Sequence, residues 1–121
     1  SLIIAQRLAR RLCEKCKTAE EIPRAALEEE GFTSEALDEG FTTFKAVGCD
    51  QCSDGYKGRV GIYQVMKISE EMGRIIMDNG TAIDLADQAQ KEGVNDLRQS
   101  GLLKVIQGVT SLEEVNRVTK D

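Results

Sequence analysis

The residues best suited to chemistry are four cysteines in two C-x-x-C pairs, Cys13 with Cys16 and Cys49 with Cys52. A C-x-x-C turn holds two sulfurs about one edge of a Zn–S tetrahedron apart, so two such turns can supply a complete tetrahedral site. The intervening residues, 17–48, make a gap longer than the roughly 15–20 residues typical of a zinc ribbon. That gap can hold a helix and a strand as an insertion. The spacing therefore predicts one structural Zn²⁺ bound by all four thiolates.

Other uses of the four thiols stay open at this point. A rubredoxin-like iron site has the same ligands, but zinc is favoured because no redox partner is evident. A redox-active dithiol usually has a thiol whose pKa is lowered by the N-terminus of a helix, whereas Cys13 is expected to follow the C-terminal end of a helix. Two pairs of inert core thiols are the third alternative. With all four positions filled by protein, a bound metal would stabilise the fold and take no part in a reaction.

Five cations flank the cysteines in an otherwise acidic chain of net charge −5: Arg11, Lys15, Lys17, Lys57 and Arg59. Four thiolates on one Zn²⁺ leave a formal charge of −2, which these side chains would offset. The acidic residues gather in residues 18–40, and we interpret that block as a solvated helix face rather than a docking surface. Nucleic-acid binders usually show a basic face with interleaved aromatic residues. We expect no nucleic-acid partner.

No catalytic constellation is found in the sequence. Histidine, the commonest general base, is absent, and no G-x-x-x-x-G-K-[ST] phosphate loop occurs. The glycine-rich stretch at residues 55–61 is better explained as a turn between the second cysteine pair and a strand. We therefore assign no catalytic residue and no nucleotide-binding residue to this chain.

The sequence shows neither a membrane-spanning run nor a signal peptide, and these observations set the expected cellular compartment. No run approaches the roughly 18 consecutive apolar residues of a membrane-spanning helix, and the arginine-rich start does not resemble a signal peptide. A reducing cytoplasmic compartment is expected, where paired cysteines more often bind metal than form disulfides. No Met begins the chain, so we expect a segment of a longer protein.

The elements that must position the cysteines can be outlined from periodicity. Apolar residues at helical spacing predict a helix over residues 2–12, and Pro23 and Gly31 bracket a short helix over 23–30. A single helical turn follows, capped by Thr33 or Ser34. Residues 41–47 and 59–67 have strand character and are expected to pair antiparallel.

The remainder, after residue 67, is predicted to form four short helices. Their expected caps are Ser69, Thr81 with Asp84, Asn95, and Ser111 with Glu114 as an S-x-x-E capping box. The fold class is therefore α+β, with a small zinc-knuckle subdomain containing a short antiparallel β-hairpin, followed by a C-terminal helical subdomain.

Three ordered stretches resemble a known family: "AQRLARRLCEKCK", "GCDQCSDGYKGRVGIYQVM" and "DLRQSGLLKVIQGVTSLEEVNRVTKD". They are similar to the C-terminal part of the type II secretion and type IV pilus assembly ATPases, and most similar to the pilus-extension branch. The resemblance spans nearly the whole chain and is weakest in residues 18–45. In that family two Cys pairs form a tetracysteine zinc subdomain, which corresponds to Cys13, Cys16, Cys49 and Cys52.

The resemblance implies a division of the chain. Residues 1–12 would be the last helix of a RecA-like ATPase core, 13–67 the zinc-binding subdomain and 68–121 the C-terminal helical subdomain. The family's nucleotide-binding motifs, which use ATP and Mg²⁺, have no counterpart here. Its nucleotide-contacting arginines also lie elsewhere, so Arg7, Arg10 and Arg11 receive no catalytic role.

The resemblance also implies a parent protein, a cytoplasmic hexameric ATPase associated peripherally with the inner membrane. The implied partners are the RecA-like core of the same chain, neighbouring subunits of the homohexamer, and an inner-membrane platform protein. This segment would support the motor without hydrolysing ATP. The alternatives are a free-standing, zinc-ribbon-like adaptor for protein interaction and, third, a thiol-disulfide oxidoreductase.

Overall fold

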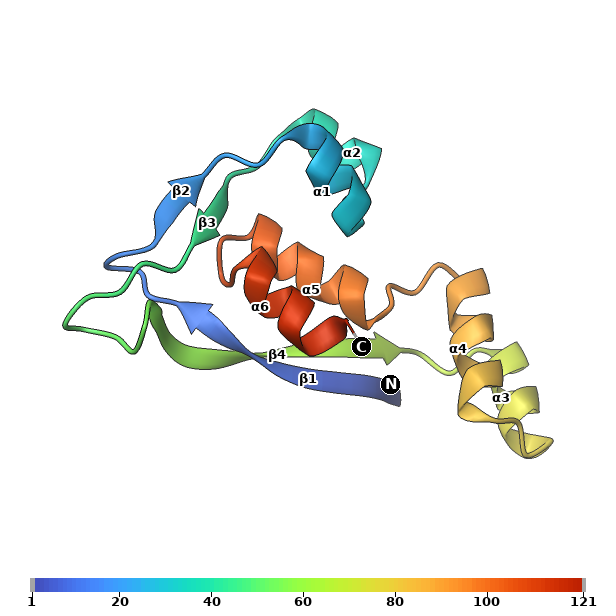
Figure 1. Ribbon diagram of the computed structural model, residues 1–121. Helices are drawn as coiled ribbons and strands as arrows, with labels where there is room; N and C mark the ends of the chain where they lie inside the picture. The colour runs from blue at the N-terminus through green and yellow to red at the C-terminus, as the bar shows by residue number, and fades with distance from the viewer. Residues whose placement is uncertain (1, 121) are drawn as a thin grey trace.

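The computed structural model describes residues 2–120 and has an α+β fold, as predicted (Figure 1). Two long strands form a ribbon, with helices packed along it and two short strands near one end. In chain order the elements are β1 (Leu2–Leu12), β2 (Thr18–Glu20), α1 (Arg24–Glu30), α2 (Ser34–Glu39), β3 (Thr43–Lys45), β4 (Tyr56–Met66), α3 (Glu70–Met77), α4 (Ala82–Lys91), α5 (Leu97–Ile106) and α6 (Leu112–Thr119).

The helix expected over residues 2–12 is wrong, because these residues form strand β1. It pairs antiparallel with β4, and the register runs from Leu2 opposite Met66 to Leu12 opposite Tyr56. Register shifts interrupt the pairing between residues 3 and 5 and between 10 and 12. Such irregularities break the period of two along a strand. The apolar residues of β1 therefore recur at spacings of three and four, which imitate a helix.

The expected pairing of residues 41–47 with residues 59–67 is also wrong. Strand β3 pairs instead with β2, from Thr18 opposite Lys45 to Glu20 opposite Thr43. The Thr43 hydroxyl reinforces this pair by donating to the carbonyl of Glu20 at 2.7 Å. Strand β2 escaped prediction because its three residues are all exposed and carry no alternating pattern.

The helix boundaries mostly agree with the capping signals. Thr33, Ser69 and Thr81 each accept a hydrogen bond from a backbone N–H of the first turn, and Thr81 with Asp84 forms a complete capping box. Helix α5 departs from the prediction, since Asp96 rather than Asn95 caps it. Asn95 and Asp96 both have side chains that can accept a hydrogen bond, but only Asp96 lies three residues before Gln99, which completes the capping box.

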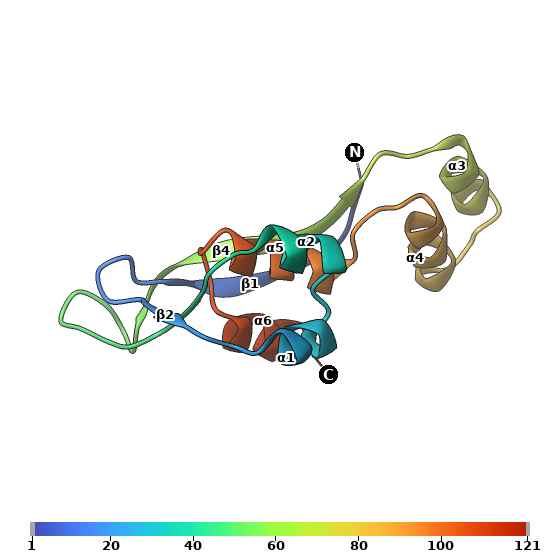
Figure 2. The same ribbon diagram turned by 90° about the horizontal axis from the view of Figure 1, so that it is seen from above.

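The main core lies between the ribbon and the C-terminal helices α5 and α6 (Figure 2). Ile62 of β4 is fully buried there, whereas its neighbours Tyr63 and Val65 are exposed. This alternation agrees with the strand character expected for residues 59–67. Phe32 and Leu27, from the α1–α2 segment, close the other side of the same core. The C-terminal helices thus bridge the ribbon and the inserted segment 18–45.

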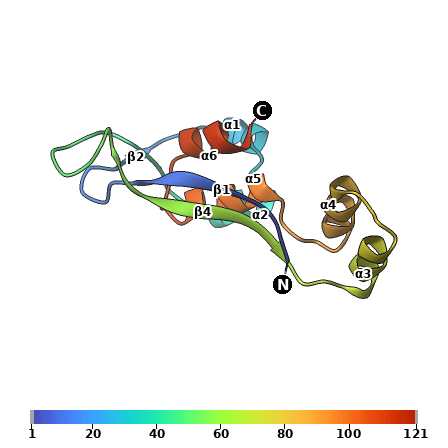
Figure 3. The ribbon, with the colours of Figure 1, turned by 90° about the horizontal axis from the view of Figure 1, so that it is seen from below.

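Helices α3 and α4 pack against each other and project beyond the end of the ribbon (Figure 3). A second, smaller core forms there around Met66, Met72 and Ala89. The four predicted C-terminal helices are therefore all present but belong to two separate cores. Within residues 2–120, no helix combines the length and apolar character needed to span a membrane.

Candidate metal centre

The structure brings the four predicted ligands together at one end of the ribbon. Cys13 and Cys16 lie in the turn that follows β1, and Cys49 and Cys52 lie in the loop that precedes β4. All four sulfurs lie within 4.8 Å of one another. The antiparallel pairing of β1 with β4 accounts for this, because it places the end of one strand beside the start of the other.

The distances between the sulfurs fit a tetrahedral metal site. Sγ of Cys13 lies 3.8 Å from Sγ of Cys49, Cys16 lies 3.8 Å from Cys52, and Cys49 lies 3.6 Å from Cys52. A tetrahedron with Zn–S bonds of 2.3 Å has an edge of about 3.8 Å. The cysteines are unbridged, and these separations are nearly twice the roughly 2.05 Å of a disulfide. The four thiols could therefore hold one metal ion.

Backbone groups shape each half of the site. The N–H of Gly48 donates to Sγ of Cys16 at 3.3 Å, and the N–H of Gln51 donates to Sγ of Cys49 at 3.4 Å. The N–H of Cys13 donates to the carbonyl of Gly55 at 2.9 Å, which ties the first turn to the second loop. The N–H groups of Gly48 and Gln51 stabilise the thiolate forms of the sulfurs that accept from them, as metal ligation requires.

Gly55 holds the second loop in a conformation that a side chain would prevent. Its φ is +93°, and a Cβ there would lie 2.6 Å from Cβ of Ala46 and 2.7 Å from the nitrogen of Val47. The close approach of these two chain segments lets the loop curl back beneath the sulfurs. Gly55 begins the glycine-rich stretch that was expected to form a turn, but the rest of that stretch belongs to β4, which starts at Tyr56.

Crowding separates the pKa values of the thiols. Burial acts to raise the pKa of the Cys13 thiol, but hydrogen bonds from Lys15, Cys16 and Cys49 lower it to about 7. For Cys49 the N–H of Gln51 acts to lower the pKa, yet burial and the neighbouring thiols raise it to about 12. Four adjacent thiols thus resist full ionisation, and a divalent cation would offset that repulsion.

The cations predicted to surround the cysteines do not contact the sulfurs directly. Lys17 is the one of these five cations that forms an ion pair with a described residue, and its Nζ lies 3.1 Å from Glu14 and donates to the carbonyl of Gly108 at 3.0 Å. The same ammonium lies 4.6 Å from the centre of the Phe44 ring. Lys17 therefore links the first cysteine turn to the loop between α5 and α6.

Further contacts join that loop to the ribbon beside the cysteines. The N–H of Leu12 donates to the carbonyl of Val109 at 2.9 Å, and the Thr110 hydroxyl donates to the carbonyl of Arg10 at 2.7 Å. The hydroxyls of Tyr56 and Ser111 share a buried hydrogen bond of 2.7 Å. The cysteine cluster is thus connected to the main core through the α5–α6 loop.

The sequence interpretation missed a buried ion cluster at the start of α6. Ser111 caps the helix as predicted, but Glu114 does not complete the expected capping box. Its carboxylate instead accepts hydrogen bonds from Arg10 and Arg117, and its side chain is only 1% exposed. The S-x-x-E pattern carried no information about a partner more than 100 positions away.

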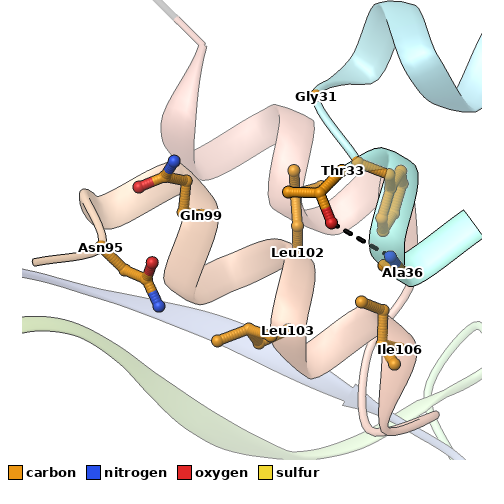
Figure 4. Close-up of a pocket in the computed structure, with 9 residues that line it drawn as sticks. Gly31, Thr33, Ala36, Asn95, Gln99, Leu102, Leu103 and Ile106 are labelled. Atoms are coloured by element: carbon orange, nitrogen blue, oxygen red, sulfur yellow. Dashed lines mark hydrogen bonds between the residues drawn. The ribbon is translucent and has the colours of Figure 1, made fainter. Parts of the chain in front are cut away.

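One surface hollow has the apolar wall typical of a ligand pocket, but no reactive side chain lines it. It lies between α5 and the segment Gly31–Ala36, with Phe32, Leu102, Leu103 and Ile106 as its apolar wall (Figure 4). Thr33, Asn95 and Gln99 supply its polar atoms, and the Thr33 hydroxyl already accepts from the N–H of Ala36 at 3.1 Å. No ionisable side chain lines this hollow.

Comparison with known proteins places this geometry in a family. Residues 1–117 match the family described as "Type II/IV secretion system protein". The chain is 60% identical over its whole length to the type IV pilus assembly ATPase PilB of Pseudomonas aeruginosa, covering 21% of that protein. It is 43% identical over 95% of its length to PilB of Myxococcus xanthus, covering 20% of it.

A more distant relative comes from the secretion branch. The type II secretion system ATPase E of Vibrio cholerae is 34% identical over 98% of this chain, which covers 23% of that protein. The chain thus spans about a fifth of the length of the curated relatives it matches. The match over residues 1–117 includes both cysteine pairs and all but the end of α6. This chain belongs to the type II/IV secretion system protein family.

Proposed function

We propose that this chain is a zinc-stabilised, non-catalytic segment of a hexameric ATPase that powers type IV pilus assembly. Relatives named as pilus assembly ATPases match it at higher identity than those named for type II secretion, which supports the pilus branch. Family membership also favours this role over a free-standing adaptor. The parent would bind ATP and Mg²⁺ through residues outside this chain, in the cytoplasm at the inner membrane.

The observation that carries the proposal is the closed set of four thiols. Cys13, Cys16, Cys49 and Cys52 would all bind the metal, so no position is left for water or substrate. The chemistry that zinc supplies in such a site is the cross-linking of two chain segments. Because a preformed site is absent from the unfolded chain, binding free energy becomes folding free energy.

The proposed division of labour follows from the packing. Residues 1–12, of which Leu2–Leu12 form strand β1 rather than a helix, would connect the segment to the RecA-like core. Residues 13–67 would carry the zinc, and residues 68–121 would supply surfaces for neighbouring subunits and for the platform protein. The contacts of the α5–α6 loop with Arg10, Leu12 and Lys17 support a mechanical link between these parts.

Metal analysis of the full-length protein tests the zinc. We expect one zinc per chain, and loss of that zinc in Cys49→Ser together with a lower melting temperature. Ser53→Ala is the matched control, because Ser53 is exposed and adjacent to Cys52. Zinc content near zero in the wild-type protein, or a melting temperature unchanged by chelation, would contradict the proposal.

ATP hydrolysis tests the assignment to a motor. The full-length protein should hydrolyse ATP, and residues 1–121 alone should not. We expect Cys49→Ser to reduce the amount of assembled hexamer while leaving the turnover of each assembled hexamer unchanged. Turnover by the isolated segment would overturn the assignment, as would a full-length protein without ATPase activity.

A further inference from the structure

The tip of the α3–α4 pair exposes large apolar side chains that the fold does not use. Met77 is 82% exposed and Ile83 is 73% exposed, and Ile76 beside them is also exposed. All three lie at or near the connection between the end of α3 and the start of α4. Single exposed apolar residues are normal, but a group of them at one place marks an interaction site.

The small core of this pair is complete without these residues. Met72 and Ala89 are fully buried, with Ile75 and Leu85 packed against them. Ile76, Met77 and Ile83 belong to neither core. The three exposed side chains are therefore not the partly exposed margin of either core. In Figures 2 and 3 the two helices stand apart from the rest of the molecule, so this tip is open to approach.

The α3–α4 pair carries more acidic than basic side chains. Residues 68–93 contain six acidic side chains and two basic ones. Arg74 is already paired with Glu70 and Glu71. Asp78, Asp84 and Asp87 line one surface hollow, in which Lys91 is the one cation of the lining. Within residues 2–120 neither Asp78 nor Asp87 has a cationic partner within 4.0 Å.

We propose that the α3–α4 tip is a docking surface for a basic, amphipathic segment of a different polypeptide. Ile76, Met77 and Ile83 would take the apolar side of that segment, and Asp78 and Asp87 would pair with its cations. An apolar centre with a charged rim is the usual anatomy of a protein interface. Complementary charge at the rim supplies orientation and speeds association.

The negative charge of the tip favours a basic protein segment over a membrane or a nucleic acid as the partner. Anionic membranes and nucleic acids attract basic segments, so an acidic tip is unsuited to either. A protein segment rich in Lys or Arg is the complementary choice. The proposal deepens the proposed function by naming a site and a partner chemistry within residues 68–121. It does not depend on the zinc, because no cysteine contributes to the tip and its small core is separate from the main one.

A designed peptide tests the surface on the full-length protein. The probe is a short helical peptide with Leu at positions i, i+3, i+4 and i+7 and Lys elsewhere, and its control replaces every Lys by Glu. We expect the Lys peptide to bind, and Met77→Ser with Ile83→Ser to weaken binding by about tenfold, which is about 1.4 kcal/mol. Asp78→Lys with Asp87→Lys should weaken it at least as much.

The control variants separate this site from general attraction to an acidic protein. Glu35→Lys with Glu39→Lys makes the same charge change on exposed positions of α2, and Val47→Ser removes an exposed apolar side chain elsewhere. Neither should change the affinity for the Lys peptide by more than about twofold. Equal losses in the tip and control variants, equal binding of the Glu peptide, or no binding of the Lys peptide would each overturn the proposal.

Cross-linking in cells identifies the natural occupant. A photoreactive residue is placed at position 77 of the full-length protein, and at position 47 in the control. We expect an adduct at position 77 only, on a peptide of another protein that carries net positive charge. An adduct on a second copy of this chain, on lipid or on nucleic acid, or no adduct beyond the control, would contradict the proposal.

Discussion

Glu114 of α6 is buried against Arg10 of β1, and the two residues are joined by three hydrogen bonds. The backbone N–H of Arg10 donates to Oε1 at 3.0 Å, its Nε donates to the same oxygen at 3.1 Å, and its Nη2 donates to Oε2 at 3.1 Å. Arg117 donates to both oxygens from the other side. One carboxylate thus fixes α6 onto the ribbon close to the metal centre.

Glu114→Gln should destabilise the fold. The carboxylate is almost wholly buried, and glutamine would lose the charge that strengthens its hydrogen bonds from Arg10 and Arg117, although both guanidinium groups stay about half exposed to water. We expect the free energy of unfolding to fall by about 1–3 kcal/mol, measured by urea denaturation with metal present. Glu113→Gln is the control, because Glu113 neighbours it on the exposed side of α6. Equal stability of the two variants would contradict a structural role for the cluster.

The same cluster predicts how stability depends on pH. Burial acts to raise the pKa of Glu114, but hydrogen bonds from Arg117 and Arg10 outweigh it and lower the pKa from 4.5 to about 2. A lowered pKa in the folded state adds stability above the unfolded value and loses it as pH falls through the folded value. The contribution should therefore be complete above about pH 5 and vanish progressively down to about pH 2.

Comparison with Glu114→Gln isolates this effect from the other carboxylates. The difference in unfolding free energy between wild type and Glu114→Gln should shrink as pH falls from about 5 to about 2, since a protonated Glu114 resembles glutamine. Acid also protonates the thiols, but it does so equally in both proteins. A difference that stays constant over this range would show that the charge of Glu114 contributes nothing.

Local signals in the sequence predicted the grouping of the four cysteines better than the fold. Cys13, Cys16, Cys49 and Cys52 were identified as candidate ligands from their spacing, because residue type and turn geometry are local properties, and the structure places their sulfurs together. Their convergence in space required only that the two turns meet. The capping residues Thr33, Ser69 and Thr81 were likewise found, since each cap is decided within four residues.

Partners distant in the sequence were not predictable in this way. Strand β1 was mistaken for a helix because its bulges hid the alternation, and only its pairing with β4, more than 40 residues away, fixes it as a strand. Glu114 matched a helix-cap pattern, but Arg10 outcompetes the cap for its oxygens. In both cases a distant contact overrides the local preference, which a sequence window cannot show.

Gly55→Ala should damage the metal centre more than a backbone effect alone would. Positive φ disfavours any side chain, and here a Cβ would also collide with Ala46 and the backbone of Val47. We expect a loss of about 2–4 kcal/mol in unfolding free energy and weaker metal retention in a chelator competition. Gly93→Ala is the matched control, because its φ is +79° but nothing lies within 4 Å of the added Cβ.

The Gly93→Ala control should cost only about 1 kcal/mol and leave metal retention unchanged, since it carries the backbone strain without the collision. The difference between the two variants measures how much the close approach at Gly55 matters. If Gly55→Ala retained metal as well as Gly93→Ala does, the loop would not need its tight curl beneath the sulfurs.

Gly73→Ala should stabilise the α3–α4 pair. Gly73 lies inside α3, and nothing lies within 4 Å of a Cβ added there. Glycine in a helix interior is destabilising by roughly 0.5–1 kcal/mol relative to alanine, so that gain is expected. Because α3 and α4 share a small core of their own, the gain should appear as slower hydrogen exchange in residues 70–91.

Gly101→Ala is the contrasting variant, because a Cβ added at Gly101 of α5 would lie 2.9 Å from Cγ1 of Val115 in the main core. Gly101→Ala should lower the melting temperature. A stabilising effect of Gly101→Ala, or faster hydrogen exchange in Gly73→Ala, would contradict the packing described for α5 and α3.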